Sequence, residues 1–318
     1  MSDKQQVMAA EDRPLASGWV RARRVAGFVA AGTMSLYLVV KIVWVIGAFI
    51  GAVPQEFGAN MPEWIALNVV TIGMAGLGVA LGLALAQEWG KRIPAWIVIL
   101  FAWAASGFLV SLLPYSVLSA LLGAAGGGSG GDPVSEPFPA WDLAFIGVGF
   151  TGMALGLIVA VPVYMRERWP AAFTGRSRDA RAASGARLGF ALAATAVPVA
   201  LWTYWAAGGT AGLNPDALDL WNRDSRLLVG TSAAWAVLGA WSVCALGRGR
   251  LPMWLPMTLG FVASGSLFAW NAWRILWLLL PITDLEPLKS PWVAGVEHVL
   301  SMAAGLAMMS ILLRAYRR

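Results

Sequence analysis

The chain has 318 residues, of which 58% are hydrophobic and only 13% are charged, and its mean hydropathy is +0.67. Soluble domains carry about 25% charged residues and disordered chains have low hydrophobicity, so both classes are excluded. The composition indicates a polytopic membrane protein, in which a net charge of +6 reflects topology rather than nucleic-acid binding.

The N-terminal stretch is polar and basic, and the apolar segment that follows it is too long for a signal peptide. We expect residues 1–24 to form a mobile cytoplasmic tail that precedes an uncleaved first helix.

Eight segments are apolar over the roughly 20 residues that a transmembrane helix needs. They cover residues 25–53, 64–87, 94–122, 140–165, 188–207, 227–246, 252–281 and 292–313. The third and seventh are longer than one span requires, so we expect each to tilt or to run into an interfacial turn, near Pro114 and Pro281.

Basic residues alternate between the two ends of these segments. Most lie in the N-terminal tail, in the second, fourth and sixth connections, and in the C-terminal tail, whereas the opposite connections hold only Arg223, Arg226 and Lys289. Because basic residues stay on the cytoplasmic side, the pattern predicts a multi-pass protein of the cell membrane with both termini in the cytoplasm. The preference for Arg over Lys, with abundant Ala, Gly and Trp, is typical of a bacterial gene of high GC content.

The two halves of the chain share short motifs in one register. Arg92-Ile93-Pro94-Ala95-Trp96 matches Arg250-Leu251-Pro252-Met253-Trp254, and Ala105-Ser106-Gly107 matches Ala263-Ser264-Gly265. We therefore predict an all-α fold of eight transmembrane helices arranged as two four-helix repeats, residues 25–168 and 187–318, joined by a basic cytoplasmic linker at 169–186. An even number of spans in each repeat makes the repeats parallel.

Three charged residues, Lys41, Arg274 and Glu297, lie within the predicted spans and are absent from the matching positions of the other half. Charges at such depth cost about 2.5–3.5 kcal/mol and are candidates for function. Lys41 is either a member of a structural ion pair or a functional group. Arg274 either extends to the outer headgroups or faces a cavity, with Trp270 and Trp277 placed for cation–π contact.

Neighbouring polar residues extend this set. Glu297 and His298 are adjacent, so they point about 100° apart on a helix, and we expect Glu297 to face inward and to pair with Lys41 or Arg274. His298 is either an ordinary interior residue or a participant in function. Asp142 favours the N-terminal dipole of its helix or lines a cavity.

All these residues fall in the outer half of the membrane. We expect them to line an asymmetric polar cavity, open toward the outside and formed mainly by the first, seventh and eighth helices. The candidate residues of this cavity are Lys41, Asn271, Arg274, Glu297, His298 and Asp142.

The fifth helix ends in Trp202-Thr203-Tyr204-Trp205-Ala206-Ala207-Gly208-Gly209. This segment resembles an uncharacterised actinobacterial family of small four-span membrane proteins, which have a similar Tyr-Trp-x-x-Gly-Gly run before the first outer loop. The resemblance covers the second half of the chain. It implies a four-span unit and no activity.

Three functions fit these features. The first is binding or transport of a small or lipidic molecule through the polar cavity. The second is a membrane-embedded enzyme for a lipophilic substrate, with Glu297 or Asp142 as the acid and Lys41 or Arg274 as an electrostatic stabiliser. The third is an interaction or immunity protein that uses Trp-rich outer loops.

One Cys and one His argue against a metal site, and we expect no cofactor. The Gly-rich stretch 123–131 reads as a flexible linker rather than a phosphate loop, because it lacks a terminal Lys-Ser or Lys-Thr. The expected partners are membrane lipid and a small-molecule or lipidic ligand, without nucleic acid.

Overall fold

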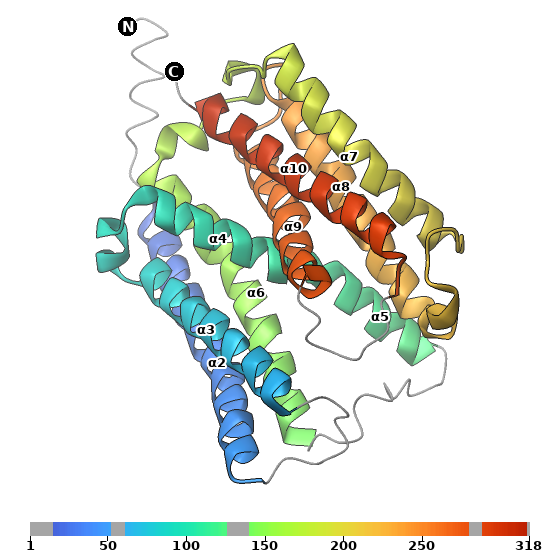
Figure 1. The fold of residues 1–318 in the computed structure, drawn as a ribbon. Coiled ribbons are helices and arrows are strands. Elements are labelled where there is room, and N and C mark those ends of the chain that lie inside the picture. Colours follow the sequence, from blue (N-terminus) through green and yellow to red (C-terminus); the bar gives the residue numbers. More distant parts are fainter. Residues whose placement is uncertain (1–14, 52–60, 126–139, 280–287, 317–318) are drawn as a thin grey trace, which may run out of the picture.

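The computed structural model describes residues 15–51, 61–125, 140–279 and 288–316. Long helices dominate this part of the chain (Figure 1). They are α2 (Ser17–Phe49), α3 (Met61–Ala86), α4 (Ala95–Leu109), α5 (Leu113–Ala125), α6 (Ala140–Arg168), α7 (Gly185–Ala206), α8 (Arg223–Ala245), α9 (Trp254–Leu279) and α10 (Pro291–Tyr316). Short 3₁₀ turns connect some of them: η2 (Glu88–Arg92), η3 (Val110–Leu112), η5 (Pro170–Ala172), η6 (Ser177–Asp179) and η7 (Pro215–Leu220).

Seven helical segments among the described residues are long and apolar enough to cross a bilayer, which makes this a helical, multi-span membrane protein. They are Ser17–Phe49, Ile65–Ala86, Ala95–Gly123, Ala144–Arg168, Gly185–Ala206, Arg223–Ala245 and Pro291–Ala315. Helix α9 has 26 residues but is not among the seven, and it carries polar residues such as Ser266, Asn271 and Arg274.

The helices form two groups. In the first, α2 packs along both α3 and α6; in the second, α7 packs along both α8 and α10, and α9 packs between α8 and α10 (Figure 1). Small residues permit the closest approaches: a Cβ added to Gly152 of α6 would lie 2.4 Å from the Thr33 side chain of α2, and one added to Gly156 would lie 2.6 Å from the Ala26 carbonyl oxygen.

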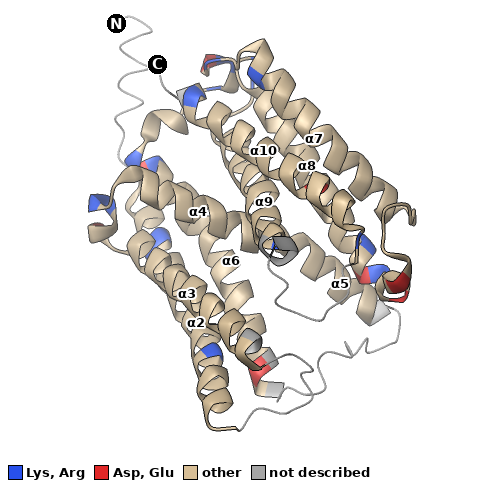
Figure 2. Ribbon diagram, in the orientation of Figure 1, with Lys and Arg blue, Asp and Glu red and all other residues tan. Residues whose placement is uncertain are grey.

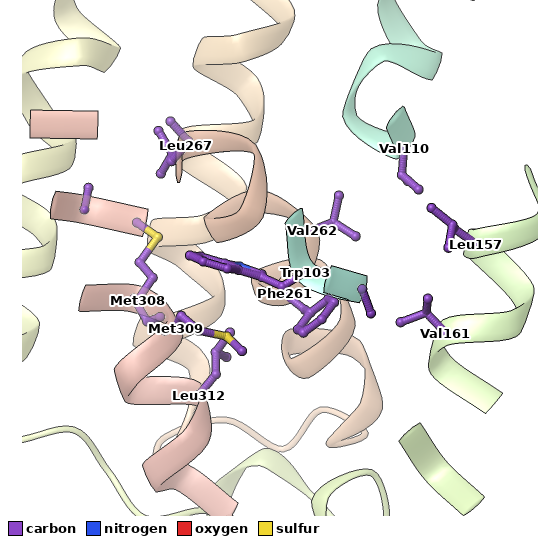
Figure 3. Packing of buried hydrophobic residues seen from close by; sticks show 14 of the residues in the cluster. Trp103, Val110, Leu157, Val161, Phe261, Val262, Leu267, Met308, Met309 and Leu312 are labelled. Carbon is purple, nitrogen blue, oxygen red and sulfur yellow. The ribbon is translucent and has the colours of Figure 1, made fainter. Parts of the chain in front are cut away.

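The two groups meet mainly where α4 crosses α9. A Cβ added to Gly107 would lie 2.1 Å from the carbonyl carbon of Gly265, so the two backbones touch at these glycines. The Trp103 indole donates a 2.9 Å hydrogen bond to Ser264 Oγ and stacks on Phe268, with ring centroids 4.8 Å apart. Figure 3 shows the apolar side chains gathered around this crossing. They include Leu157 and Val161 of α6, Phe261 and Val262 of α9, and Met308, Met309 and Leu312 of α10.

The expected turn near Pro114 is present and breaks the third apolar segment into α4 and α5. Proline has no N–H to donate to the Val110 carbonyl, and the Leu113 N–H bonds that carbonyl in a 3₁₀ turn instead. The Ser111 carbonyl accepts a 2.9 Å hydrogen bond from the Trp235 indole of α8. Helix α5 therefore continues onto the second group of helices. Pro281 lies outside the described residues.

Helix α2 begins at Ser17, within the stretch expected to be a mobile tail. Its Arg23 is fully buried, bonds Glu167 at the end of α6 (3.0 Å), and also reaches Glu88 of η2 (3.2 Å). Lys91 bonds the same two carboxylates. Because Arg23 is buried and paired, the helix extends through the basic stretch, and the expectation of a mobile tail is corrected for residues 17–24. Residues 1–14 lie outside the described part.

The connections that the structure describes lie at two ends of the molecule, and most of the charged residues in this part of the chain lie toward these ends (Figure 2). At one end, the Ser177 N–H bonds the Leu251 carbonyl and the Arg181 N–H bonds the Ala315 carbonyl, which joins the fourth and sixth connections to the end of α10. At the other end, the Asn214 N–H bonds the Leu288 carbonyl, which joins the fifth and seventh connections. The linker expected at 169–186 is thus folded onto its neighbours.

Candidate functional site

A first polar cluster lies where α2, α3 and α6 meet. Lys41 Nζ donates a 2.9 Å hydrogen bond to Asn68 Oδ1 and lies 4.0 Å from the centroid of the Trp44 ring. The Trp44 indole in turn donates a 2.7 Å hydrogen bond to Asp142 Oδ2. The Lys41 ammonium thus lies over the Trp44 ring, and the Asp142 carboxylate accepts from the Trp44 N–H. Both charged groups therefore contact the same aromatic side chain.

A second polar cluster lies where α7, α9 and α10 meet. Glu297 is fully buried and accepts hydrogen bonds from Lys289 Nζ (2.6 and 2.8 Å) and from the Trp202 indole (2.6 Å). One position further along α10, His298 Nδ1 lies 2.8 Å from Asn271 Oδ1 of α9. Lys289 also lies 4.6 Å from the centroid of the Trp205 ring.

The structure divides the six candidate residues between these clusters, which corrects the expectation of a single cavity shared by Lys41 and Glu297. Lys41 bonds Asn68, and Glu297 pairs with Lys289 rather than with Lys41 or Arg274. The division follows from the packing, because α2 belongs to one group of helices and α10 to the other.

Both Glu297 and His298 are buried, although they point in different directions as expected. Helix α10 packs against α7 on one side and α9 on the other. Glu297 therefore contacts Trp202 of α7, and the adjacent His298 contacts Asn271 of α9. Arg274 lies beside this cluster with its guanidinium 6.0 Å from the centroid of the Trp270 ring, as the spacing predicted. The side chain of Trp277 lies outside the described part.

The polar space beside Arg274 and Asn271 is small. Its volume is about 20 Å³, enough for a water molecule and not for a larger solute. Among the described residues, the second cluster is therefore a set of paired side chains that links α7, α9 and α10 beside a small polar space.

An apolar pocket of about 400 Å³ lies in the first half of the molecule. Side chains of α2, α3, α4, α6 and α9 line it, and almost all of them are apolar. The lining residues include Met34, Met74, Leu77, Phe101, Ala104, Ala105, Phe108, Phe150, Met153, Trp270 and Trp273.

The course of α4 explains why the pocket is open. In the second group α9 packs closely against both α8 and α10, whereas α4 makes only limited contact with α3 and α6. The α4 backbone is held instead against α9 by Gly107 and Gly265, and its last turn is held by the Trp270 indole, which donates to the Phe108 carbonyl (3.2 Å). As a result, α4 does not fill the space between α3 and α6, and this space forms the pocket.

The first polar cluster stands at one end of this pocket. Tyr37 and Thr71 both line the pocket. Lys41 lies one helical turn after Tyr37, with its Nζ 5.6 Å from the Tyr37 ring centroid, and the Thr71 hydroxyl bonds the backbone of Asn68. The pocket is therefore apolar along its length and polar at the end nearest Lys41.

A second apolar pocket, of about 470 Å³, lies between α4, α6, α9 and α10 near Trp96 and Trp169. Neither pocket has a charged side chain in its lining, but the first contains the Tyr37 and Thr71 hydroxyls. The pocket beside Lys41 is the better candidate for recognition, because these hydroxyls give it hydrogen-bonding groups and lie next to a polar cluster.

Several residues of the clusters are not apparent from the sequence. Lys289 reads as an outer-loop residue, yet it lies eight positions before Glu297 and its side chain is only 10% exposed. Nothing in the sequence indicates the partners of Trp44 and Trp202, yet each donates its indole N–H to a carboxylate. The spacing of Trp44 from Lys41, three residues on one helical face, is a signal that was present in the sequence.

No protein-family profile matches the chain, and no curated protein or solved structure resembles it at a significant level.

Proposed function

We propose that the chain is an eight-span protein of the cell membrane, with α9 as the additional span and both termini in the cytoplasm, built from two parallel four-helix repeats. Gly107 and Gly265, which match each other between the halves, contact each other where α4 crosses α9. In each half the first long helix packs along the second and the last. Both features support a pseudo-two-fold axis close to these glycines.

We further propose that this protein binds a lipidic molecule in the apolar pocket of its first half. The single observation that carries the proposal is the 400 Å³ volume between α3, α4 and α6, which is lined almost wholly by apolar side chains and whose polar lining residues, Tyr37 and Thr71, lie next to Lys41 and Asn68. Ligand sites occupy about 300–1,000 Å³ and combine an apolar lining with a few polar groups. A lipid chain is the solute that the surrounding bilayer supplies to such a pocket.

Binding is favoured over catalysis by the state of the polar groups. Glu297, an acid that the sequence suggested, is held by Lys289 and the Trp202 indole. An acid or base needs an oxygen that can reach its substrate, and both side-chain oxygens of Glu297 already accept hydrogen bonds within the protein.

Native mass spectrometry of the purified protein tests the proposal. Ala104→Phe places a ring in the pocket, because Ala104 lines it and is partly exposed. We expect lipid to stay bound to the wild type and to be lost from this variant. The matched control is Val70→Phe, since Val70 is exposed on α3 and is absent from the lining. Equal lipid retention in all three proteins would contradict the proposal.

A further inference from the structure

Asp142 has one side-chain oxygen that no described residue hydrogen-bonds. Its side chain is buried, Oδ2 accepts from the Trp44 indole, and Oδ1 has no partner among the described residues. Buried carboxylate oxygens are normally hydrogen-bonded, because an unsatisfied one loses its hydration without replacement. Asp142 Oδ1 is thus an acceptor for which the described residues supply no donor.

The ammonium of Lys41 supplies the complementary group. It has three N–H donors, of which one bonds Asn68 Oδ1, while the Trp44 ring faces the ammonium. Lys41 and Asp142 share Trp44 and are electrostatically coupled, and opposite charges make the cluster neutral as a whole. A donor and an acceptor therefore belong to one cluster, which lies next to the Tyr37 side of the apolar pocket.

From this arrangement we propose that the ligand is a long-chain lipid with a neutral hydroxyl headgroup, whose oxygen accepts from Lys41 Nζ and whose proton is donated to Asp142 Oδ1. This inference rests on the proposed lipid pocket and adds the chemistry of the headgroup. Tyr37 and Thr71 stand between the headgroup site and the apolar lining, and the chain extends toward Phe108 and Trp270.

The charges of the cluster select against other headgroups. An anionic headgroup is attracted by Lys41 but meets the Asp142 carboxylate, and a cationic headgroup meets the Lys41 ammonium. Only a group that both donates and accepts satisfies the two side chains without adding a buried charge.

Competition among lipids of one chain length tests the inference. The full-length protein is labelled with a diazirine-bearing long-chain alcohol, and oleyl alcohol, oleyl sulfate, oleyl trimethylammonium and octadecene compete for the label. We expect oleyl alcohol to compete about ten-fold better than the other three, which is the effect of one charge-assisted hydrogen bond. We expect Lys41→Met to remove this preference for the alcohol.

Asp142→Asn gives a sharper result. The remaining side-chain oxygen still accepts from Trp44, but Lys41 loses its countercharge. The preference should therefore change from oleyl alcohol to oleyl sulfate, which a purely structural role of Asp142 does not predict.

Two outcomes overturn the headgroup assignment: equal competition by octadecene and oleyl alcohol, or a preference of the wild type for oleyl sulfate. Both leave the lipid pocket itself in place, whereas labelling that Ala104→Phe does not reduce contradicts the pocket. The wild-type order of competitors decides the matter even where a variant does not fold.

Discussion

Among the described residues two ion pairs are almost wholly buried, Arg23–Glu167 and Lys289–Glu297. Glu297 is fully buried, and the Lys289 side chain is 10% exposed. Removing one member of such a pair leaves the other charged and unsolvated, whereas removing both leaves a neutral site. The pair holds the connection before α10 against α10 itself.

This pairing leads to a prediction for three variants. Lys289→Met should lower the free energy of unfolding by about 3–5 kcal/mol, because Glu297 is left without its cation. Adding Glu297→Gln, which keeps an oxygen for the Trp202 indole, should restore part of that loss. Unfolding in mixed micelles measures both effects. Additive losses in the double variant would show that the two side chains do not form a pair.

Glu88 provides a pH dependence at the opposite end of the molecule. Hydrogen bonds from Lys91 and Arg24 lower the pKa of Glu88 from its ordinary value of 4.5 to about 2. A carboxyl with a lowered folded-state pKa stabilises the fold fully above about pH 4.5, and this contribution is lost as the pH falls toward 2. The effect is small because the side chain is 56% exposed.

We therefore expect the melting temperature of the wild type to fall between pH 4.5 and pH 2.5 more than that of Glu88→Gln. Thermal unfolding in detergent at a series of pH values measures the difference. Identical pH profiles for the two proteins would remove Glu88 from the account.

At the residue scale, the sequence shows which side chains are unusual and not which ones meet. Lys41, Glu297 and Asp142 stand out because a charge in an apolar segment is costly. Their partners Asn68, Lys289 and Trp44 depend on how the helices pack, and no local pattern predicts that packing.

Among the helices, α4 and α9 decide the architecture, since the contact of Gly107 with Gly265 joins the two groups. The close approach leaves no space for a methyl group on either residue. Pro114 then ends α4, and the carbonyls near the break accept hydrogen bonds from Trp235 and Trp270 of the second group.

Gly107→Ala tests this contact. The added Cβ meets backbone atoms that cannot move away, so we expect the free energy of unfolding to fall by about 1–3 kcal/mol. The matched control is Gly76→Ala in α3, where a Cβ has nothing within 4 Å, and this variant should be neutral or slightly stabilised. Equal stability of the two variants would show that α4 and α9 do not touch at Gly107.

At the element scale, the apolar segments were predictable because each needs about 20 residues to span a bilayer. The turn near Pro114 followed from the missing N–H of proline. The start of α2 at Ser17 could not be predicted from the sequence. A run of basic residues resembles a solvated tail unless its acidic partners, here Glu167 and Glu88, are known.

At the scale of the whole molecule, the two groups of helices meet mainly where α4 crosses α9, and the first group holds an apolar pocket next to a charged cluster. The orientation that the alternation of basic residues predicts stays a prediction. The pocket was not foreseeable from the sequence, because it depends on α4 leaving α3 and α6 to pack on α9.

The proposed orientation makes a prediction about the two termini. Fusions of green fluorescent protein to either terminus should fluoresce, because this reporter indicates the cytoplasmic side. Fusions of alkaline phosphatase should be inactive, because this enzyme reports the opposite side of the membrane. Phosphatase activity at either terminus would contradict eight spans with both termini in the cytoplasm.

The most direct test of the lipid pocket is to map where a photoreactive lipid attaches. A long-chain alcohol with a diazirine on its chain is irradiated with the protein in nanodiscs, and the labelled peptides are identified by mass spectrometry. We predict labelling of α3 and α4 around Met74, Leu77 and Phe101, with Ala104→Phe removing it and Val70→Phe leaving it unchanged. Labelling spread evenly over the lipid-facing helices, or unaffected by Ala104→Phe, would contradict the account.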